Sequence, residues 1–312
     1  MVSSLVVVLP AYNEETRLGP ALDELFAYLC SAPAGALPEA VSVLVVDDGS
    51  TDGTAALVRT RPEFAADGSD GERAARPPRD RAAIDEKSVP HGGPGARLSL
   101  RLLSVPHGGK GSAVRAGMLA ADGDLLLFAD ADMATPPDQI PKLVVALLSA
   151  DVAIGSRIQP DGSDMRATQP RFRRMVGRLF RFAAQVWVTG PVRDTQCGFK
   201  GFTRSAARDL FGRLRITSIV FDVDLIYLAR KRGYRIAIVP IVWADRRGSR
   251  MQARPKLAIR VAWDLVRIRF IHRGVRKAAA ESATAGAVPA RSLAGAANPS
   301  TKGETREETP EP

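Results

Sequence analysis

The chain has 312 residues, of which 45% are apolar and 25% charged, a composition typical of a globular protein and unlike that of a collagen-like chain. Its two cysteines, Cys30 and Cys197, are far apart in unrelated contexts and imply neither a disulfide framework nor a zinc site. The net charge of +10 alone would favour a nucleic-acid binder, but it is unevenly divided, with −8 over residues 1–156 and +18 over 157–275. An acidic half suits a cation with a nucleotide, whereas a basic half suits a phosphate-bearing partner or an anionic membrane surface.

The first half of the chain alternates short apolar runs with helical patterns. The run at 4–9 is rich in β-branched residues and lacks the basic region and cleavage site of a signal peptide, so we expect a first strand there. Further elements are expected at 17–29 (helix), 41–46 (strand), after Asp52 (helix), 100–104 (strand), 110–121 (helix) and 125–129 (strand). Apolar strands separated by helices predict a doubly wound α/β domain with a parallel sheet covered on both faces. Its ligands should lie beyond the carboxyl ends of the strands.

Two stretches differ from this pattern in composition. Residues 62–97 and 278–312 are rich in small and polar residues and lack apolar periodicity. We therefore expect a flexible surface insertion and a disordered tail. The predicted organisation is an α/β domain over 1–250 that contains the insertion, a helix over 251–275 and a tail over 276–312.

Carboxylates and amides gather where three of the expected strands end. The first strand leads into Tyr12-Asn13-Glu14, the second ends in the turn 47–52, and the strand 125–129 is followed by Asp130 and Asp132. Each turn alone could merely cap the next helix, but their shared position favours a binding site. Mg²⁺ and Mn²⁺ are held by one or two carboxylates together with substrate phosphates. A metal that joins the protein to a nucleotide diphosphate fits this pattern.

A glycine-rich segment at 107–113 lies between these turns in the sequence. It fails the Walker pattern, because no Gly stands five residues before the Gly109-Lys110 pair and Gly111 occupies the Ser/Thr position. What remains is a glycine-rich helix start that can approach a ligand closely, with Lys110 beside it.

The basic half contains two segments that suit a membrane surface. Six arginines lie within 166–181 among apolar residues, and they fit either an entrance for a lipid phosphate or a solvated helix face. Residues 256–273 have a polar stripe at helical spacing and an apolar arc with Trp263, so this helix either lies in the membrane plane or packs on the α/β domain. Because no apolar stretch reaches roughly 18 residues, any membrane contact is expected to be peripheral.

Several runs of the second half, with the strand-end turns, resemble glycosyltransferase family 2, and within it the dolichyl-phosphate glucosyltransferases. The runs are Arg193-Asp194-Thr195-Gln196-Cys197-Gly198-Phe199-Lys200, Phe221-Asp222-Val223-Asp224-Leu225 and the segment from Trp243 to Arg250. The resemblance covers about residues 3–272 apart from the insertion. It implies a GT-A fold and an inverting, Mg²⁺- or Mn²⁺-dependent enzyme. Such an enzyme moves a hexose, here glucose from UDP-glucose, to a polyprenyl phosphate at the cytoplasmic face of a membrane.

The resemblance also implies roles for individual residues. The expected nucleotide-sugar site comprises Pro10, Tyr12, Glu14, Asp48, Lys110, Asp130, Arg246 and Arg250. The expected catalytic residues are Asp130, Asp132 and Arg157, with Asp132 as the metal ligand, and the expected acceptor site comprises Arg157, Arg173 and Gln196. Two positions depart from the family, which usually has Asn in place of His107 and Lys in place of Arg250.

The acceptor decides whether a general base is needed. A phosphate oxygen is ionised at neutral pH and needs none, whereas a hydroxyl acceptor needs a carboxylate within hydrogen-bond reach. Asp222 and Asp224 are the candidates for this base, and Asp224 completes the expected catalytic set, although either carboxylate could instead orient an arginine or the acceptor loop. Other open interpretations are GDP-mannose or a UDP-N-acetylhexosamine as the donor, a hydroxyl acceptor, and a non-catalytic nucleotide or nucleic-acid binding module. The acidic first half argues against nucleic acid.

Overall fold

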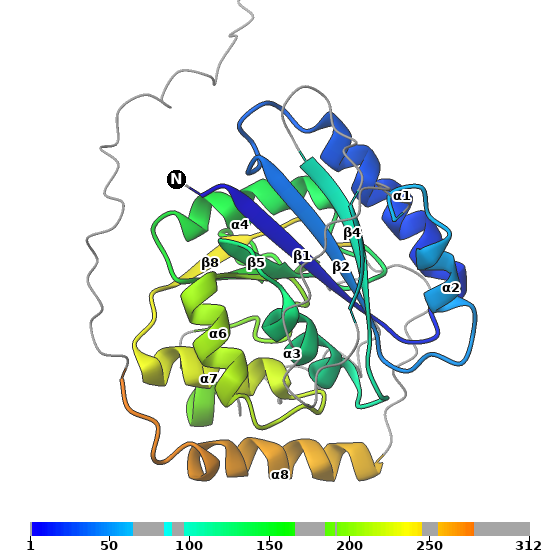
Figure 1. Cartoon of the computed structure of the whole chain (residues 1–312). Helices are drawn as coiled ribbons and strands as arrows, with labels where there is room; N and C mark the ends of the chain where they lie inside the picture. Colours follow the sequence, from blue (N-terminus) through cyan, green and yellow to red (C-terminus); the bar gives the residue numbers. More distant parts are fainter. Residues whose placement is uncertain are drawn as a thin grey trace, which may run out of the picture. The chain divides into compact units, whose positions relative to one another are not determined.

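The computed structural model describes residues 2–64, 84–88, 97–165, 185–190, 192–244 and 255–277. Within these residues, eight strands form one sheet in the order β3-β4-β2-β1-β5-β7-β6-β8 (Figure 1). The strands are β1 (Ser4–Ala11), β2 (Ala40–Asp47), β3 (Ile84–Ser88), β4 (Arg97–Ser104), β5 (Leu125–Phe128), β6 (Val152–Ser156), β7 (Lys200–Thr203) and β8 (Ile236–Pro240). The helices are α1 (Glu15–Ser31), α2 (Thr54–Arg59), α3 (Lys110–Ala120), α4 (Ile140–Leu147), α6 (Arg204–Arg213), α7 (Phe221–Arg232) and α8 (Pro255–Ile271), with the short turns η1 (Pro137–Gln139) and η3 (Gln185–Thr189).

The strands predicted from the first half of the sequence form the parallel part of the sheet. Strand β1 pairs in parallel with β2 and β5, and β2 pairs in parallel with β4. The apolar run of β1 is buried on both faces: Leu5 and Val7 belong to one core cluster, and Val6 and Val8 to the other. The absence of polar alternation in the sequence therefore reflects helices on both sides of the sheet, and the predicted α/β fold class is confirmed.

Two further strands pair in the antiparallel direction. Strand β7 runs antiparallel to both β5 and β6, and β3 runs antiparallel to β4. Neither strand was expected from the sequence, because antiparallel pairing of a four-residue strand such as β7 depends on contacts distant in sequence. Strand β3 also lies inside the segment 62–97, which the composition assigned to an insertion without regular structure.

The helices cover the sheet in two layers. Helices α1, α2 and α4 pack on one face, where their buried side chains include Leu22, Val58 and Leu143. Helices α3, α6 and α7 pack on the other face, where Phe128 of β5 contacts aromatic rings of α6 and α7. The first residue of α3 contacts Asp130, and the first residue of α7 contacts Phe128. Both helices therefore begin near the carboxyl end of β5, where ligands are expected.

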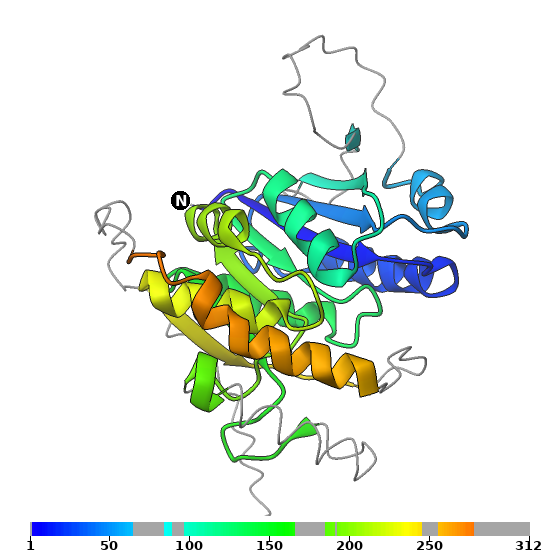
Figure 2. The same cartoon turned by 90° about the horizontal axis from the view of Figure 1, so that it is seen from below.

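Helix α8 lies along the lower edge of the molecule beside α7 (Figure 1), and Figure 2 looks onto it from below. Its residues Leu265 and Ile268 are buried together with Val188 of η3 and Val220 and Val223. One face of α8 therefore packs on the α/β domain, as one of the two interpretations expected. None of the described helices is both long enough and apolar enough to cross a bilayer.

Several predicted features lie outside the described residues. They are Arg173 with the other arginines of 166–181, Arg246, Arg250, the segments 65–83 and 89–96 of the predicted insertion, and residues 278–312 of the predicted tail.

Candidate active site

The chain turns immediately after β5 and brings two carboxylates to the carboxyl edge of the sheet. Met133 adopts a φ of 48°, and its N–H donates to the carbonyl of Asp130 (3.1 Å). The N–H of Ala134 donates to Oδ1 of Asp132 (3.1 Å). In an extended strand, Asp130 and Asp132 would point to the same face, because they are two residues apart. The turn instead gives each carboxylate its own set of neighbours.

The carboxylate of Asp130 is held between two distant segments. Lys110, the first residue of α3, donates from Nζ to Oδ1 of Asp130. Gly198 lies so close to the same carboxylate that a Cβ at this position would overlap with it. A glycine at 198 is therefore required by the close approach of Asp130, which explains its place in the motif 193–200.

Asp132 has a different environment. Burial raises the pKa of its carboxyl group, and the nearby negative charge of Asp130 adds to this rise. Among the described residues, the hydrogen bond from Ala134 is the only one given to its carboxylate. Oδ2 of Asp132 is therefore the available oxygen at this edge of the sheet.

A buried ion pair lies next to Lys110 and Asp130. Lys200 of β7 is completely buried and donates from Nζ to Oδ1 of Asp222 (2.5 Å) and to the carbonyl of Cys197 (2.6 Å). Burial raises the pKa of Asp222, although the positive charges of Lys200 and Lys110 oppose the rise. Burial would lower the pKa of Lys110, but the carboxylates of Asp130, Asp222 and Asp132 outweigh this effect and raise it. The site thus holds alternating charges contributed by β7, α7, α3 and the turn after β5.

An aromatic pair stands at the end of β1. The rings of Tyr12 and His107 are stacked, with centroids 4.1 Å apart and planes 26° from parallel. The Tyr12 residue is 39% exposed, so part of the stack remains open to solvent. A flat, exposed ring surface at the same edge of the sheet as Asp130 and Asp132 can bind a nucleobase by stacking.

Asp48 holds the glycine-rich loop that carries His107. Its carboxylate accepts hydrogen bonds from the N–H groups of Gly108 and Gly109 (both 2.8 Å) and lies 2.9 Å from Nδ1 of His107. The side chain of Asp48 is almost completely buried. Asp48 therefore positions His107 and the start of α3 through these contacts and is not itself exposed to a ligand.

The remaining residues of the predicted nucleotide site tie its turns together. Glu14 forms an ion pair with Arg17, and its N–H donates to the hydroxyl of Thr54 (2.8 Å). Pro10 lies near the end of β1 and pairs with Val46 of β2. Through these contacts, Glu14 and Pro10 fix the backbone on either side of Tyr12.

The predicted acceptor residues lie after β6 and before α7. The guanidinium of Arg157 pairs with both carboxylate oxygens of Asp194 (2.8 and 2.6 Å), and it lies 5.6 Å from the ring centroid of Trp243. Although burial opposes it, this pairing raises the pKa of Arg157, to which the charge of Asp130 also contributes. Gln196 donates from its amide to the carbonyl of Ile219 (3.4 Å), next to the start of α7.

Asp224 does not join the predicted site. It is completely buried, its Oδ2 accepts hydrogen bonds from the N–H groups of Arg215 and Ile216 (3.2 and 3.1 Å), and its Oδ1 lies 2.6 Å from Nε2 of His272. A role as general base does not fit a carboxylate enclosed in this way, and the interpretation is corrected on that ground. Asp224 instead fixes the loop before α7 and the segment that follows α8.

The structure therefore brings together Lys110, Asp130 and Asp132, and Tyr12 lies at the same edge of the sheet. The contributions of Asp194, Gly198 and Lys200 were missed, although all three belong to the run 193–200 that carried the family resemblance. Their roles depend on contacts with residues far away in the sequence, so the run marked their importance without indicating their function.

Gly198→Ala should reduce transfer activity roughly 10²-fold, because displacement of a positioning carboxylate by about 1 Å has effects of this size. The added methyl group would push Asp130 away from Lys110. Gly212→Ala, at a position on α6 where a Cβ would meet nothing within 4 Å, is the matched control and should keep full activity. Steady-state kinetics on both variants check this expectation, and equal activities would contradict it.

Asp224→Asn should destabilise the fold by about 1 to 3 kcal/mol, because the amide cannot accept every hydrogen bond made by the carboxylate. The rate per folded molecule should stay unchanged, since Asp224 faces His272 and the loop at 215–216. Urea unfolding measures the first quantity, and kinetics well below the unfolding transition measure the second. A large loss of rate in a fully folded variant would restore the catalytic interpretation.

The chain is similar to known proteins over most of its length. The profile of the family described as "Glycosyl transferase family 2" matches residues 6–68 and 96–211, with a gap inside the predicted insertion. The dolichyl-phosphate beta-glucosyltransferase of Drosophila melanogaster is 37% identical over 79% of this chain and 69% of its own length, and the Homo sapiens protein of that name is 32% identical over the same shares.

A solved structure shares the fold. Glucosyl-3-phosphoglycerate synthase from Mycobacterium tuberculosis, in complex with Mn²⁺, UDP-glucose and phosphoglyceric acid, aligns over 88% of this chain and 81% of its own with a TM-score of 0.51 and 19% identity. At this identity the likeness concerns the fold, which is GT-A. Because the family profile covers more than half of the chain and relatives exceed 30% identity over most of it, the chain is a glycosyltransferase that belongs to glycosyl transferase family 2.

Proposed function

We propose that this enzyme transfers glucose from UDP-glucose to a polyprenyl phosphate, with inversion at the anomeric carbon, as a peripheral protein at the cytoplasmic face of a membrane. Relatives named dolichyl-phosphate beta-glucosyltransferase, at 30% identity or more, support the sugar and the class of acceptor. The observation that carries the proposal is the group of Lys110, Asp130 and Asp132 at the same edge of the sheet as the stacked rings of Tyr12 and His107.

The donor set at this edge suits a hard divalent cation. The described residues contain no group of three or more His, Cys, Asp and Glu side chains that could hold a metal, so a cation would take its other ligands from the donor diphosphate. Asp132, with its available oxygen, is the proposed ligand, and Asp130 is already paired with Lys110. A related fold with bound Mn²⁺ supports Mn²⁺ or Mg²⁺. Such an ion would supply positive charge to the departing diphosphate.

The protein side chains would bind the donor at two points. The uracil ring would stack on the exposed side of the Tyr12–His107 pair. Lys110, at the start of α3, would face the diphosphate, together with Arg246 and Arg250 of the segment beyond residue 244. Positive groups fixed before the reaction stabilise the charge that develops on a leaving group.

The engaged carboxylates favour a phosphate as the acceptor. Asp222 is paired with Lys200, and Asp224 with His272. Neither is available to take a proton from a hydroxyl group, whereas an ionised phosphate oxygen attacks without a base. Arg157, held by Asp194, would then face the acceptor together with Arg173 and Gln196.

A panel of donors and acceptors tests the proposal. The purified protein would be incubated with Mg²⁺ or Mn²⁺ and labelled UDP-glucose, GDP-mannose or UDP-N-acetylglucosamine, each with decaprenyl phosphate or with decaprenol. The expected result is a labelled product, extractable into organic solvent, from UDP-glucose and decaprenyl phosphate alone. A product from decaprenol would favour a hydroxyl acceptor, and no product from any pair would contradict the proposal.

Tyr12→Ala should weaken the binding of UDP about tenfold, because base stacking on an aromatic side chain contributes about 1 to 3 kcal/mol. Tyr12→Phe keeps the ring and should bind UDP as the unchanged protein does. Isothermal titration of both variants with UDP in the presence of Mn²⁺ makes the comparison. Equal affinities for the Ala and Phe variants would place the nucleobase elsewhere.

A further inference from the structure

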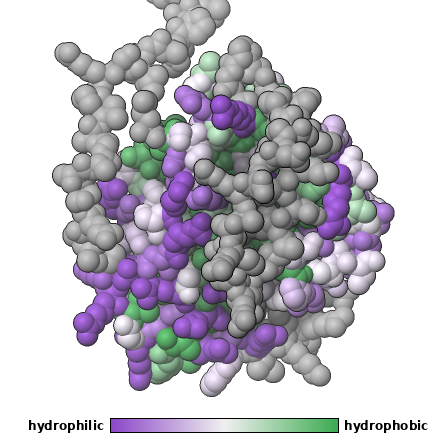
Figure 3. Space-filling view, viewed as in Figure 1, coloured by the Kyte–Doolittle hydropathy of each residue, from purple (hydrophilic) through white to green (hydrophobic). Residues whose placement is uncertain are grey.

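Helix α8 presents an apolar ridge opposite its buried face. Trp263, Val266 and Phe270 are 65%, 45% and 50% exposed, and their spacing of three and four residues places them on one side of the helix. Arg260 and Arg267 flank this ridge on one side, and Arg269 and Arg273 on the other. Figure 3 shows hydrophobic and hydrophilic residues side by side at the lower edge of the molecule, where α8 lies in Figure 1.

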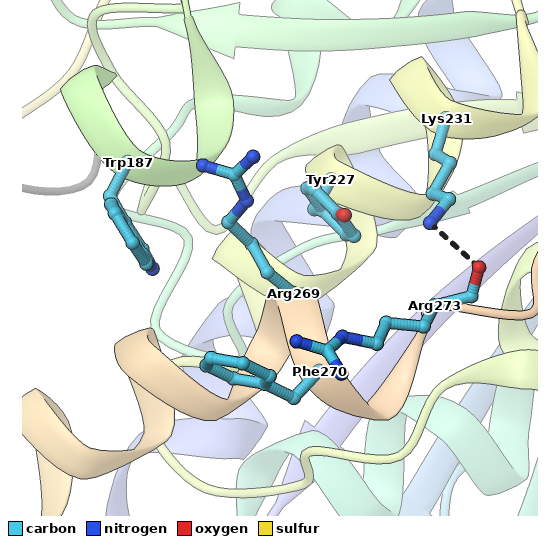
Figure 4. Close-up of a pocket in the computed structure, with 6 residues that line it drawn as sticks. All are labelled: Trp187, Tyr227, Lys231, Arg269, Phe270 and Arg273. Atoms are coloured by element: carbon cyan, nitrogen blue, oxygen red, sulfur yellow. Dashed lines mark hydrogen bonds between the residues drawn. The ribbon is translucent and has the colours of Figure 1, made fainter.

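A pocket opens beside the second flank of this ridge. It has a volume of about 380 Å³ and lies between η3, α7 and α8 (Figure 4). We call it the α7–α8 pocket. It is lined by Trp187, Tyr227, Lys231, Arg269, Phe270 and Arg273. The volume is in the range of small-ligand sites, and the lining consists of aromatic rings and cations.

The cations of the pocket are held against its rings. The guanidinium of Arg269 lies 4.8 Å from the ring centroid of Trp187, and that of Arg273 lies 4.6 Å from the ring centroid of Phe270. Lys231 donates from Nζ to the carbonyls of His272 (2.7 Å) and Arg273 (3.3 Å). A contact with a ring face does not use the N–H donors of a guanidinium, and these donors match the geometry of a phosphate.

The α8 side of the pocket is almost free of carboxylates. Over the described residues 260–277, the one acidic side chain is Asp264, which is buried and bonded to Ser218 (2.7 Å). No ion pair joins Arg269 or Arg273 to a carboxylate of the described residues. The positive charge of the pocket is therefore left for an external anion.

The pocket is separate from the candidate active site. Asp222 lies in the first turn of α7, whereas Lys231 lies in its last turn. A rise of about 1.5 Å per residue places the two roughly 14 Å apart along the helix axis. A phosphate in the pocket is thus too far from Asp130 and Asp132 to be the acceptor that attacks the donor sugar.

We propose that the α7–α8 pocket binds the phosphate of an anionic phospholipid headgroup, so that α8 lies on the membrane with its apolar ridge against the acyl chains. The ridge supplies contact with the bilayer, and Arg269, Arg273 and Lys231 supply donors for the phosphate. The inference rests on the proposed action at a membrane surface, and it adds a lipid site distinct from the acceptor site.

Vesicle flotation with charge-matched variants tests this site. The full chain would be mixed with vesicles of phosphatidylcholine alone or of phosphatidylcholine and phosphatidylglycerol in equal parts, without donor or acceptor. Arg269→Gln/Arg273→Gln removes two positive charges from the pocket flank, and Arg260→Gln/Arg267→Gln removes two from the opposite flank.

The pocket variant should bind the mixed vesicles roughly tenfold more weakly than the control variant, because it loses hydrogen bonds to phosphate in addition to charge. Equal losses in the two variants would overturn the site and indicate general attraction to surface charge.

A fluorescence arm identifies the source of the phosphate. In the variant Trp243→Phe/Trp263→Phe, emission reports on Trp187 alone among the three tryptophans. The mixed vesicles should change this emission, and phosphatidylcholine vesicles or inorganic phosphate should not. A change with inorganic phosphate alone would overturn the lipid assignment in favour of a soluble phosphate.

If the enzyme forms lipid product but the mixed vesicles do not bind, the pocket assignment fails and the proposed function stands. Vesicle binding without transfer would leave the pocket supported and contradict the function.

Discussion

Replacement of Asp132 by Asn should lower glucosyl transfer by roughly 10³-fold or more, because it removes the proposed metal ligand and with it the positive charge on the leaving diphosphate. The amide has nearly the same shape, and the N–H of Ala134 can still donate to its oxygen, so the fold should persist. The measurement is the initial rate with saturating donor and metal, together with the affinity for Mn²⁺ in the presence of UDP. Both should fall.

Asp122→Asn is the matched control for this variant. Asp122 stands just before β5, at the opposite end of the same strand, and its exposed side chain pairs with Arg204 at 3.0 Å. The same chemical change there should leave the rate and the Mn²⁺ affinity unaltered. If Asp132→Asn retained the affinity for Mn²⁺ and most of the activity, the metal would lie elsewhere.

Lys200→Met should have the largest effect on stability, a loss of about 3 to 5 kcal/mol, because it leaves the carboxylate of Asp222 buried without its partner. The melting temperature should fall by at least roughly 6 °C for a domain of this size. Activity should fall as well, because Lys200 also holds the carbonyl of Cys197, next to the Gly198 that packs against Asp130. Thermal unfolding followed by circular dichroism gives the first quantity.

A second substitution separates stability from function. The double variant Lys200→Met/Asp222→Leu has no buried charge at this place, so most of the lost stability should return. Its activity should stay low, because Lys110 loses one of the three carboxylates that act on it. A double variant that recovered both properties would show that the pair serves the fold alone.

The fold could be predicted where burial on both faces left a continuous apolar pattern. This applies to β1, β2 and β5, whose residues are nearly all buried. Strand β7 gave no such signal, because it has four residues and begins with Lys200, a charge that is stable in the core only through its pairing with Asp222. Its antiparallel direction follows from pairing with β5 and β6, which local sequence does not encode.

The candidate site was predictable where it depends on a strand end, as for Asp130, Asp132 and Lys110. It was not predictable where two carboxylates on one helix face different neighbours. Residues two apart on a helix do not share a face, so Asp222 meets Lys200 while Asp224 meets His272. Only the packing of α7 decides which of them adjoins the site.

The linkage formed in the product tests the central claim most directly. The product from UDP-glucose and decaprenyl phosphate would be isolated and examined by proton and phosphorus nuclear magnetic resonance. Transfer by phosphate attack with inversion predicts one glucose joined to the lipid phosphate through a β-glycosidic bond. An α linkage, or a product in which the glucose is not joined to the phosphate, would contradict the account.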